Sequence, residues 1–283
     1  MKLKRARKPQ RSKKILLDAA AVTLSAVLLF SVVNLIRTSR DRAKGIETYE
    51  ELRQVVVTGS VDVENTQEAG ELAEGGSDHS MEQQASEENI DRYRKVQTIG
   101  ADFGALNDIN SDVVAWISIP GTKLDYPVTQ CSDNSYYLDH LFTGESNVCG
   151  CVFLDCRNSG DFSSRHSVIY GHRMNDGTMF SCVQNYKAQS YYEGHPTATL
   201  CTPSGNYTIE FFSGYVTEAS GEPWKLNFSS DEDYSEWIDS IREKSDFEAG
   251  VTPSGSDRVI TFSTCSHAFE NARYVLHGII RNS

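Results

Sequence analysis

Positive charge is scarce in most of this chain. Twelve of the 27 Lys and Arg, but only two of the 39 Asp and Glu, fall within residues 1–44, which leaves fifteen basic against thirty-seven acidic residues in the remainder. A protein that binds nucleic acid needs a basic surface to replace the counterions condensed on the phosphates. The acidic body therefore argues against nucleic acid as a partner.

Acidic residues are absent from the first fourteen positions, "MKLKRARKPQRSKK", which carry eight Lys and Arg. The apolar stretch that follows (15–36) has about the 20 residues that a helix needs to cross roughly 30 Å of hydrocarbon. It is longer than the apolar region of a secretory signal, and "RTSRDRAK" follows in place of a small-residue cleavage site, so we expect an uncleaved anchor rather than the alternative, a cleaved signal peptide. The positive-inside rule then predicts a single-pass protein of the cell membrane with residues 1–14 in the cytoplasm and everything after residue 36 outside.

Aromatic residues are few between residues 45 and 95, a stretch rich in Glu, Gln, Ser and Gly. Such a composition cannot bury enough apolar surface to offset the conformational entropy of the chain. We therefore expect residues 37–95 to form an acidic extracellular tether, helical near "IETYEELRQVV", and the folded domain to span residues 96–283.

Long apolar runs are missing after residue 96, where short β-rich runs alternate with turn signals. The runs are four to ten residues long and include "HSVIYGH", "YTIEFFSGYVT", "RVITFST" and "RYVLHGII". Many short strands with turn-rich links are typical of a closed barrel or a sandwich. The sequence therefore predicts one mostly β domain with peripheral helices.

The clearest helix of this domain is "SSDEDYSEWIDSIREKSDF". Ser229 or Ser230 can cap its start, and acidic residues occupy its first turn. Its apolar residues recur at helical spacing and form one stripe, which consists of Tyr234, Trp237, Ile238 and Ile241. We predict that this helix crosses between two strands and packs on the barrel.

Cys265 ends the predicted strand "RVITFSTC", and a loop of seven residues (266–272) leads into "RYVLHGIIR". If the two runs pair antiparallel, Arg273 begins the neighbouring strand and both side chains reach one end of the sheet, because paired strands lie about 4.8 Å apart. Arginine is effectively always protonated, so it suits the stabilisation of an oxyanion or a lowered thiol pKa and does not suit a general base. With seven cysteines in the chain at least one is left unpaired, and Cys265 is our candidate.

A histidine is the expected base. His172 is placed best, because a strand ends at Tyr170 and Gly171 lets the backbone turn sharply before the histidine. His267 lies close to Cys265 in the sequence and remains an alternative. The pattern alone also permits an inert buried cysteine with surface groups beside it.

These segments resemble the active-site segments of sortases, which are membrane-anchored cysteine transpeptidases of mainly Gram-positive bacteria. The resemblance rests on "TFSTC", on "ARYVLHG" with its arginine after the loop, and on "YGHRM" upstream. Class B is indicated by "INSDVVAWISIPGTKLDYPVTQ", "DNSYYLDH", "VFLDCRN" and "GHRMNDGTMFSCVQNYKAQSYYEGH", and by "DEDYSEWIDSIREKS" in the place of the extra class B helix between the sixth and seventh strands. The resemblance covers roughly residues 96–283 and implies an eight-stranded β-barrel.

The resemblance also implies a reaction and a set of site residues. By position, His172 matches the catalytic histidine, Cys265 the nucleophile and Arg273 the arginine. Asn134 and Ser263 match residues that line the peptide groove. The implied enzyme cleaves a C-terminal sorting motif of surface proteins after its Thr and holds the protein as a thioester. An amine of a peptidoglycan precursor or cross-bridge then releases it as a new amide.

Two features depart from a simple sortase pattern. Glu270 and Asn271 stand where the family often has an Asp before the "AR" step, so we assign no role to a third acidic residue. The run "CGCVFLDC" brings three cysteines together, with Cys131 and His140 upstream. We expect plain packing ahead of a disulfide and a disulfide ahead of a zinc site, whose usual ligand spacing is missing. We therefore predict neither a metal nor a cofactor.

Two other functions compete with transpeptidation. An extracytoplasmic cysteine peptidase would use a cysteine and a histidine to hydrolyse peptides without transfer, and it would not need Arg273. A non-catalytic wall-binding barrel would use Cys265 only for packing. A thioester with a sorting-motif peptide distinguishes the enzymes from the barrel, and the loss of activity on Arg273→Lys favours the transpeptidase.

Overall fold

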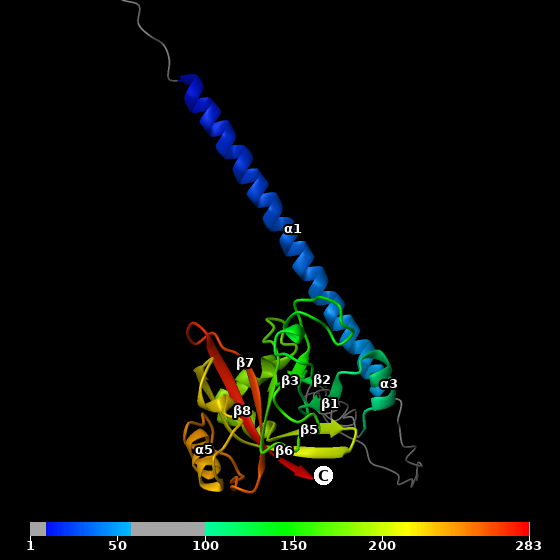
Figure 1. Cartoon of the computed structure of the whole chain (residues 1–283). Coiled ribbons are helices and arrows are strands. Elements are labelled where there is room, and N and C mark those ends of the chain that lie inside the picture. Colours follow the sequence, from blue (N-terminus) through cyan, green and yellow to red (C-terminus); the bar gives the residue numbers. More distant parts are fainter. Residues whose placement is uncertain (1–9, 58–99, 283) are drawn as a thin grey trace, which may run out of the picture. The chain divides into compact units, whose positions relative to one another are not determined.

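The computed structural model describes residues 10–57 and 100–282 (Figure 1). The chain divides into two compact units, residues 1–44 and residues 45–283. Most of the predicted cytoplasmic tail and residues 58–95 of the predicted tether lie outside the described residues. The second unit carries every residue that we predict to belong to the site.

The described residues of the first unit, 10–44, lie in one long helix. Helix α1 (Gln10–Val57) includes the predicted membrane segment and is the one helix in the described part of the chain that is long and apolar enough to cross a membrane. Its large apolar side chains are exposed, among them Leu24 and Phe30 at 68% and Leu35 at 72%. A helix that is apolar all round needs lipid or a partner to cover it. The helix is consistent with the predicted membrane anchor.

The last turns of α1 belong to the second unit. Tyr49 and Leu52 are 3% exposed and join the core of the barrel, where the ring of Tyr49 meets that of Tyr126 edge-on at 5.1 Å. The predicted helix at "IETYEELRQVV" is therefore confirmed. We predicted a tether from residue 37, but residues 45–53 pack on the barrel because apolar side chains three apart share one face of the helix.

The second unit is a closed eight-stranded barrel, as predicted, with the strand order β1-β2-β3-β4-β7-β8-β6-β5 (Figure 1). Neighbours pair antiparallel except β2 with β3 and β4 with β7, which are parallel. The strands are β1 (Val113–Ser118), β2 (Asp125–Thr129), β3 (Val152–Leu154), β4 (His166–Tyr170), β5 (Thr197–Thr202), β6 (Gly205–Glu218), β7 (Arg258–Cys265) and β8 (Ala272–Asn282).

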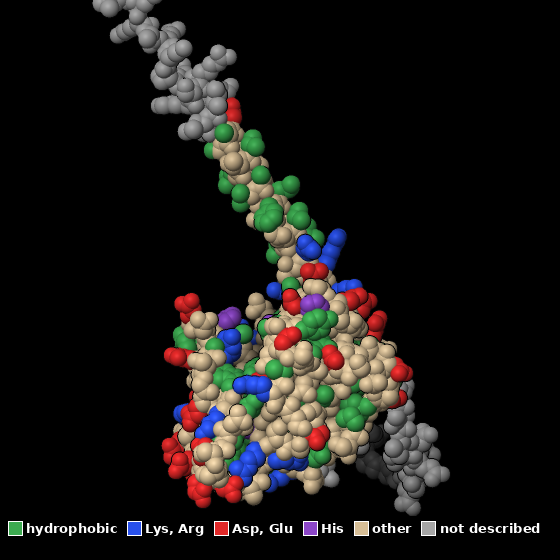
Figure 2. Space-filling model, in the orientation of Figure 1, with side chains coloured by type: hydrophobic (Ala, Val, Ile, Leu, Met, Phe, Trp, Pro, Cys, Tyr) green, Lys and Arg blue, Asp and Glu red, His purple; other side chains and the backbone are tan. Residues whose placement is uncertain are grey.

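Short helices surround the barrel. They are α3 (Phe103–Ile109), α4 (Gln189–Gly194) and α5 (Asp231–Glu243), with the 3₁₀ helices η1 (Tyr136–Leu138), η2 (Phe180–Lys187) and η3 (Glu222–Trp224). Helix α5 lies between β6 and β7 in the chain, and the Oγ of Ser230 caps it by accepting the Asp233 N–H at 3.1 Å. Its whole predicted stripe is buried, while acidic side chains gather over its outer face (Figure 2).

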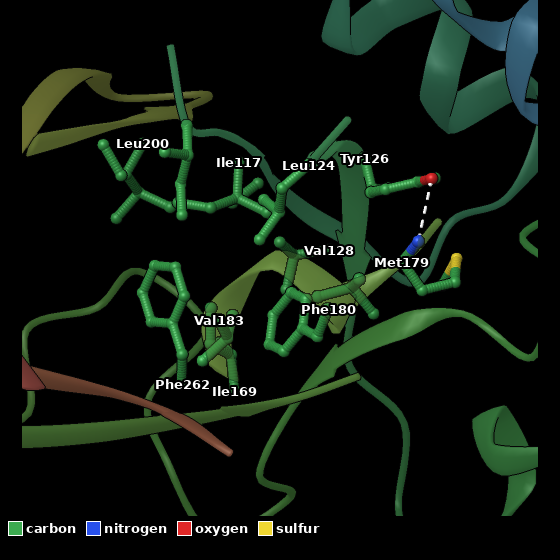
Figure 3. Packing of buried hydrophobic residues seen from close by; sticks show 14 of the residues in the cluster. Ile117, Leu124, Tyr126, Val128, Ile169, Met179, Phe180, Val183, Leu200 and Phe262 are labelled. Atoms are coloured by element: carbon green, nitrogen blue, oxygen red, sulfur yellow. Dashed lines mark hydrogen bonds between the residues drawn. The ribbon is translucent and has the colours of Figure 1, made fainter. Parts of the chain in front are cut away.

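The core anchors the segment that follows β4 to the barrel (Figure 3). The Met179 N–H donates to the hydroxyl oxygen of Tyr126 on β2 at 3.0 Å, and the next residue, Phe180, stacks on Phe262 of β7 with ring centres 5.5 Å apart. Both rings of this stack are fully buried. The far end of this segment is therefore fixed to β2 and β7.

All seven cysteines lie in described residues and are present as thiols. Cys149, Cys151, Cys182 and Cys201 are buried, which agrees with the packing role that we favoured. Burial raises the pKa of Cys151 to about 12 and that of Cys182 to about 11, which makes both poor nucleophiles. Within residues 10–57 and 100–282, no three His, Cys, Asp or Glu side chains gather in a way that could hold a metal.

Candidate active site

Cys265 and Arg273 face each other across two neighbouring strands. Strands β7 and β8 pair antiparallel, and their last register partners are Cys265 and Arg273, which confirms the predicted pairing. The Arg273 guanidinium is tied to its own strand, since Nη1 donates to the carbonyl oxygens of Ala272 at 3.1 Å and Asn271 at 3.4 Å. A thiol and a cation therefore share one end of the barrel.

Gly171 places His172 at the same end. Strand β4 runs parallel to β7, with Tyr170 opposite Ser263, and the Gly171 N–H donates to the Ser263 carbonyl at 3.2 Å. A Cβ at Gly171 would lie 2.5 Å from the Phe180 ring, closer than side chains approach. The glycine is needed for this close packing and not, as we expected, for a turn, because its φ is not in the left-handed region.

The His172 ring is held by backbone on two sides. Its Nε2 lies 2.6 Å from the carbonyl oxygen of Leu138, and a Cβ at Gly150 would stand 3.1 Å from its Cδ2. A carbonyl oxygen can only accept a hydrogen bond, so Nε2 carries the proton and Nδ1 is the basic nitrogen of the neutral ring. Gly150 itself has a φ of 58°, a conformation that favours glycine.

One cavity of about 400 Å³ joins all the predicted site residues. Its lining includes His172, Cys265, Arg273, Asn134 and Ser263. His267, the alternative base, is outside this lining and lies 3.2 Å from Arg173 Nη1 through its Nε2. A cavity with a thiol, an imidazole and a guanidinium can form and break an acyl bond on sulfur.

Four residues of the site were not predicted from the sequence. Leu138 offers only a backbone carbonyl, which no side-chain pattern reveals. The side-chain amide of Gln184 donates to the carbonyl oxygen of Cys265. Arg157 and Tyr170 line the cavity. The signal for Arg157 was present in "VFLDCRN", where an acid two residues before an arginine makes a local ion pair.

Asn271 occupies the position that we noted as a departure from the family pattern. It has a φ of 60° directly before β8. Asn and Asp both tolerate this left-handed conformation, so the exchange keeps the turn. Glu270 beside it is exposed.

Comparison with known proteins agrees with this geometry. The chain is 34% identical to sortase B of Listeria monocytogenes over 175 residues, which make up 61% of this chain and 71% of the relative. It is 35% identical to sortase B of Staphylococcus aureus over 167 residues, or 59% of this chain and 68% of the relative. No family model matches the chain.

Solved structures show the same architecture. A sortase B–substrate complex from Staphylococcus aureus and a sortase B complexed with triglycine each superimpose with a TM-score of 0.62 at 30% identity, covering 72% of this chain and 99% of the other. The closed eight-stranded barrel and the likeness to these proteins place the chain among the sortase-type cysteine transpeptidases. The chain belongs to the sortase B family.

Proposed function

We propose that this transpeptidase uses Cys265 as nucleophile, His172 as base and acid, and Arg273 as oxyanion donor, with Asn134 and Ser263 on the wall of the peptide groove. The observation that supports the proposal is that the five residues line a single cavity. A Cys–His pair with a cation beside it is the arrangement that acyl transfer through a thioester requires.

The proton path follows from the tautomer of His172. With Nε2–H bound to the Leu138 carbonyl, Nδ1 accepts the proton of the Cys265 thiol as the sulfur attacks the scissile carbonyl. The same nitrogen then gives this proton to the departing amine. In the second half of the reaction Nδ1 takes a proton from the incoming amine and gives it to the departing Cys265 sulfur as the new amide forms, which restores the thiol and the neutral imidazole.

Arg273 stabilises the oxyanion of both tetrahedral intermediates. A guanidinium has five N–H donors, and its hydrogen bonds to carbonyls within the described residues use Nη1, which leaves the donors on Nε and Nη2 for the substrate. These donors approach the scissile carbonyl from the neighbouring strand at the level of the sulfur. Lysine would supply the positive charge but not the rigid, two-pronged set of N–H donors that a guanidinium has, so it would not replace arginine here.

The acyl donor in this proposal is the C-terminal sorting motif of a surface protein, cleaved after its Thr, and the acceptor is an amine of a peptidoglycan precursor or cross-bridge. Support comes from the family and from the substrate and triglycine complexes of its members. We further propose that the long apolar helix anchors the chain in the cell membrane with its N-terminus in the cytoplasm and the barrel outside.

The test is a peptide library offered to the full chain, with acylation of the protein and transfer to triglycine scored by mass spectrometry. We expect a thioester on Cys265 in the wild type, and loss of at least about a hundredfold in rate for Cys265→Ala, His172→Ala and Arg273→Lys. All three should keep the wild-type melting temperature within a few degrees, because none of them fills the core.

Two outcomes would overturn the proposal. If Cys265→Ala unfolds the barrel, the thiol is structural. If His172→Ala stays active while His267→Ala does not, the base is His267. Release of free acid in the presence of triglycine, without amide product, would favour the hydrolytic peptidase.

A further inference from the structure

A buried carboxylate lies behind the wall of the catalytic cavity. The side chain of Asp155, directly after β3, is fully buried. Its Oδ1 accepts the backbone N–H of Arg157 at 3.0 Å and the Nε–H at 2.8 Å, and its Oδ2 accepts Arg157 Nη2 at 2.7 Å and the Tyr170 hydroxyl at 2.8 Å. These bonds engage both oxygens of the carboxylate.

Both partners of Asp155 line the cavity with His172 and Cys265. The Arg157 side chain is 58% exposed, so the guanidinium edge that does not face the carboxylate is open. Because Asp155 balances the charge of Arg157, the ion pair is neutral overall while the guanidinium still presents directed N–H donors. Such donors fit the carbonyl oxygens of a neutral peptide better than they fit a ligand with a free carboxylate.

The same turn also fixes a third wall residue. Cys156 lies between Asp155 and Arg157, and its backbone N–H donates to Oδ1 of Asn134 at 2.8 Å. Burial alone would raise the pKa of Asp155, but the hydrogen bonds from Arg157 outweigh it and hold the pKa at about 2. The carboxylate is therefore ionised at neutral pH.

We propose that Asp155 is a positioning residue for the acyl-donor peptide. It holds Arg157 in the orientation in which the guanidinium donates to a peptide carbonyl oxygen, and it takes the Tyr170 hydroxyl proton so that the Tyr170 oxygen accepts a peptide N–H. It touches no substrate itself and acts through these two side chains. The inference rests on the proposed function, since it assigns the acyl donor to the same cavity.

The first test is Asp155→Asn in the full chain, with the acylating peptide from the library above. Asparagine keeps the shape of the side chain, but its NH₂ group is a donor where the carboxylate oxygen accepted a hydrogen bond. This group meets an N–H or O–H donor of Arg157 or Tyr170, so the paired hydrogen bonds that orient the Arg157 guanidinium are lost. Hydrogen bonds to charged groups contribute about 1.5–3 kcal/mol, which corresponds to a rise in KM of roughly 10- to 100-fold. We expect kcat, and the rate at which iodoacetamide alkylates Cys265, to stay within about threefold of wild type.

The matched control is Asp161→Asn. Asp161 is exposed on the same loop and accepts from Ser159 and Ser163 instead of from a cavity residue. This variant should keep the wild-type KM and kcat.

Two further variants test the inference if Asp155→Asn does not fold. Arg157→Lys removes the two-pronged guanidinium and Tyr170→Phe removes the hydroxyl oxygen that accepts from the peptide, and each should raise KM while alkylation of Cys265 is unchanged. In a double-mutant cycle, Asp155→Asn with Arg157→Lys should raise KM by clearly less than the product of the single effects, because one acts through the other.

A wild-type KM in folded Asp155→Asn, or in both Arg157→Lys and Tyr170→Phe, overturns the inference. So does an equal loss of peptide acylation and iodoacetamide alkylation, which would indicate a general structural role. If no peptide acylates the wild type, the proposed function fails first, and the inference fails with it.

Discussion

Single residues of this site owe their identity to contacts that the local sequence does not reveal. Cys265 and Arg273 could be paired from the sequence because two β-rich runs and a short loop between them fix a hairpin. Gly171 was recognised as special for the wrong reason, because the atom that excludes a side chain there belongs to a residue nine positions later. The backbone carbonyl of Leu138, which sets the tautomer of His172, leaves no mark in the sequence at all.

Gly171→Ala tests the packing reason. The added methyl group must displace the buried Phe180 ring, and overpacking of this kind costs about 1–3 kcal/mol. We expect a lower unfolding free energy by this amount in urea and a slower acylation, because the backbone of His172 must move. Gly194→Ala is the control, since a Cβ there meets nothing within 4 Å, and it should be neutral or slightly stabilising. Equal stability of the two variants would contradict the packing argument.

Among the elements, α5 was predictable and the polar chain beside it was not. The helical spacing of its apolar residues gave its buried face in full. Beside this face, His166 Nδ1 donates to the Lys225 carbonyl at 2.7 Å, its Nε2 accepts from the Thr261 hydroxyl at 2.7 Å, and the Thr261 oxygen accepts from Nδ1 of His277 at 2.7 Å. Burial keeps both rings neutral, and with neutral rings the carbonyl at one end fixes the position of every proton in this chain of bonds. Nothing in the sequence shows that these two histidines are fully enclosed.

This chain of bonds predicts acid sensitivity of the fold. Burial lowers the pKa of His166 to about 4, and burial, with smaller effects of His166 and Lys244, lowers the pKa of His277 well below its usual value. Below about pH 6.5 the unfolded chain binds protons that the folded chain cannot. Stability is therefore lost as pH falls from about 6.5 towards 4, by up to about 1.4 kcal/mol per pH unit for each histidine.

The measurement is urea unfolding at pH 7 and pH 5, where we expect a difference of about 3–4 kcal/mol in wild type from the two histidines. His140→Gln, at a partly exposed ring outside this chain of bonds, should show the same difference. Ring signals of His166 and His277 followed by NMR should not titrate between pH 5 and 8. A ring that titrates near pH 6.5 would refute the assignment.

At the scale of the whole molecule, the barrel was predictable because many short strands with turn-rich links have few ways to bury their apolar faces. The boundary of the domain was not. The average composition of residues 45–95 is polar, although Tyr49 and Leu52 form an apolar face on one helix within this stretch. We therefore assigned a helical part of the folded domain to the tether. Whether a short apolar pair packs depends on a partner surface, and that surface is formed by strands more than seventy residues later.

One bond of this helix end carries a consequence for motion. The Tyr49 hydroxyl donates to the carbonyl of Gly150, where an added Cβ would stand 3.1 Å from Cδ2 of the His172 ring. Loosening of the last turns of α1 and release of the histidine should then be a single opening event with one free energy. Amide hydrogen exchange should report equal opening free energies at residues 49–53 and 150–151. Tyr49→Phe should lower both by about 0.5–1.5 kcal/mol and reduce kcat without raising the peptide KM, whereas Tyr207→Phe should change neither. Independent exchange at the two segments would mean that the histidine keeps its place when the helix end detaches.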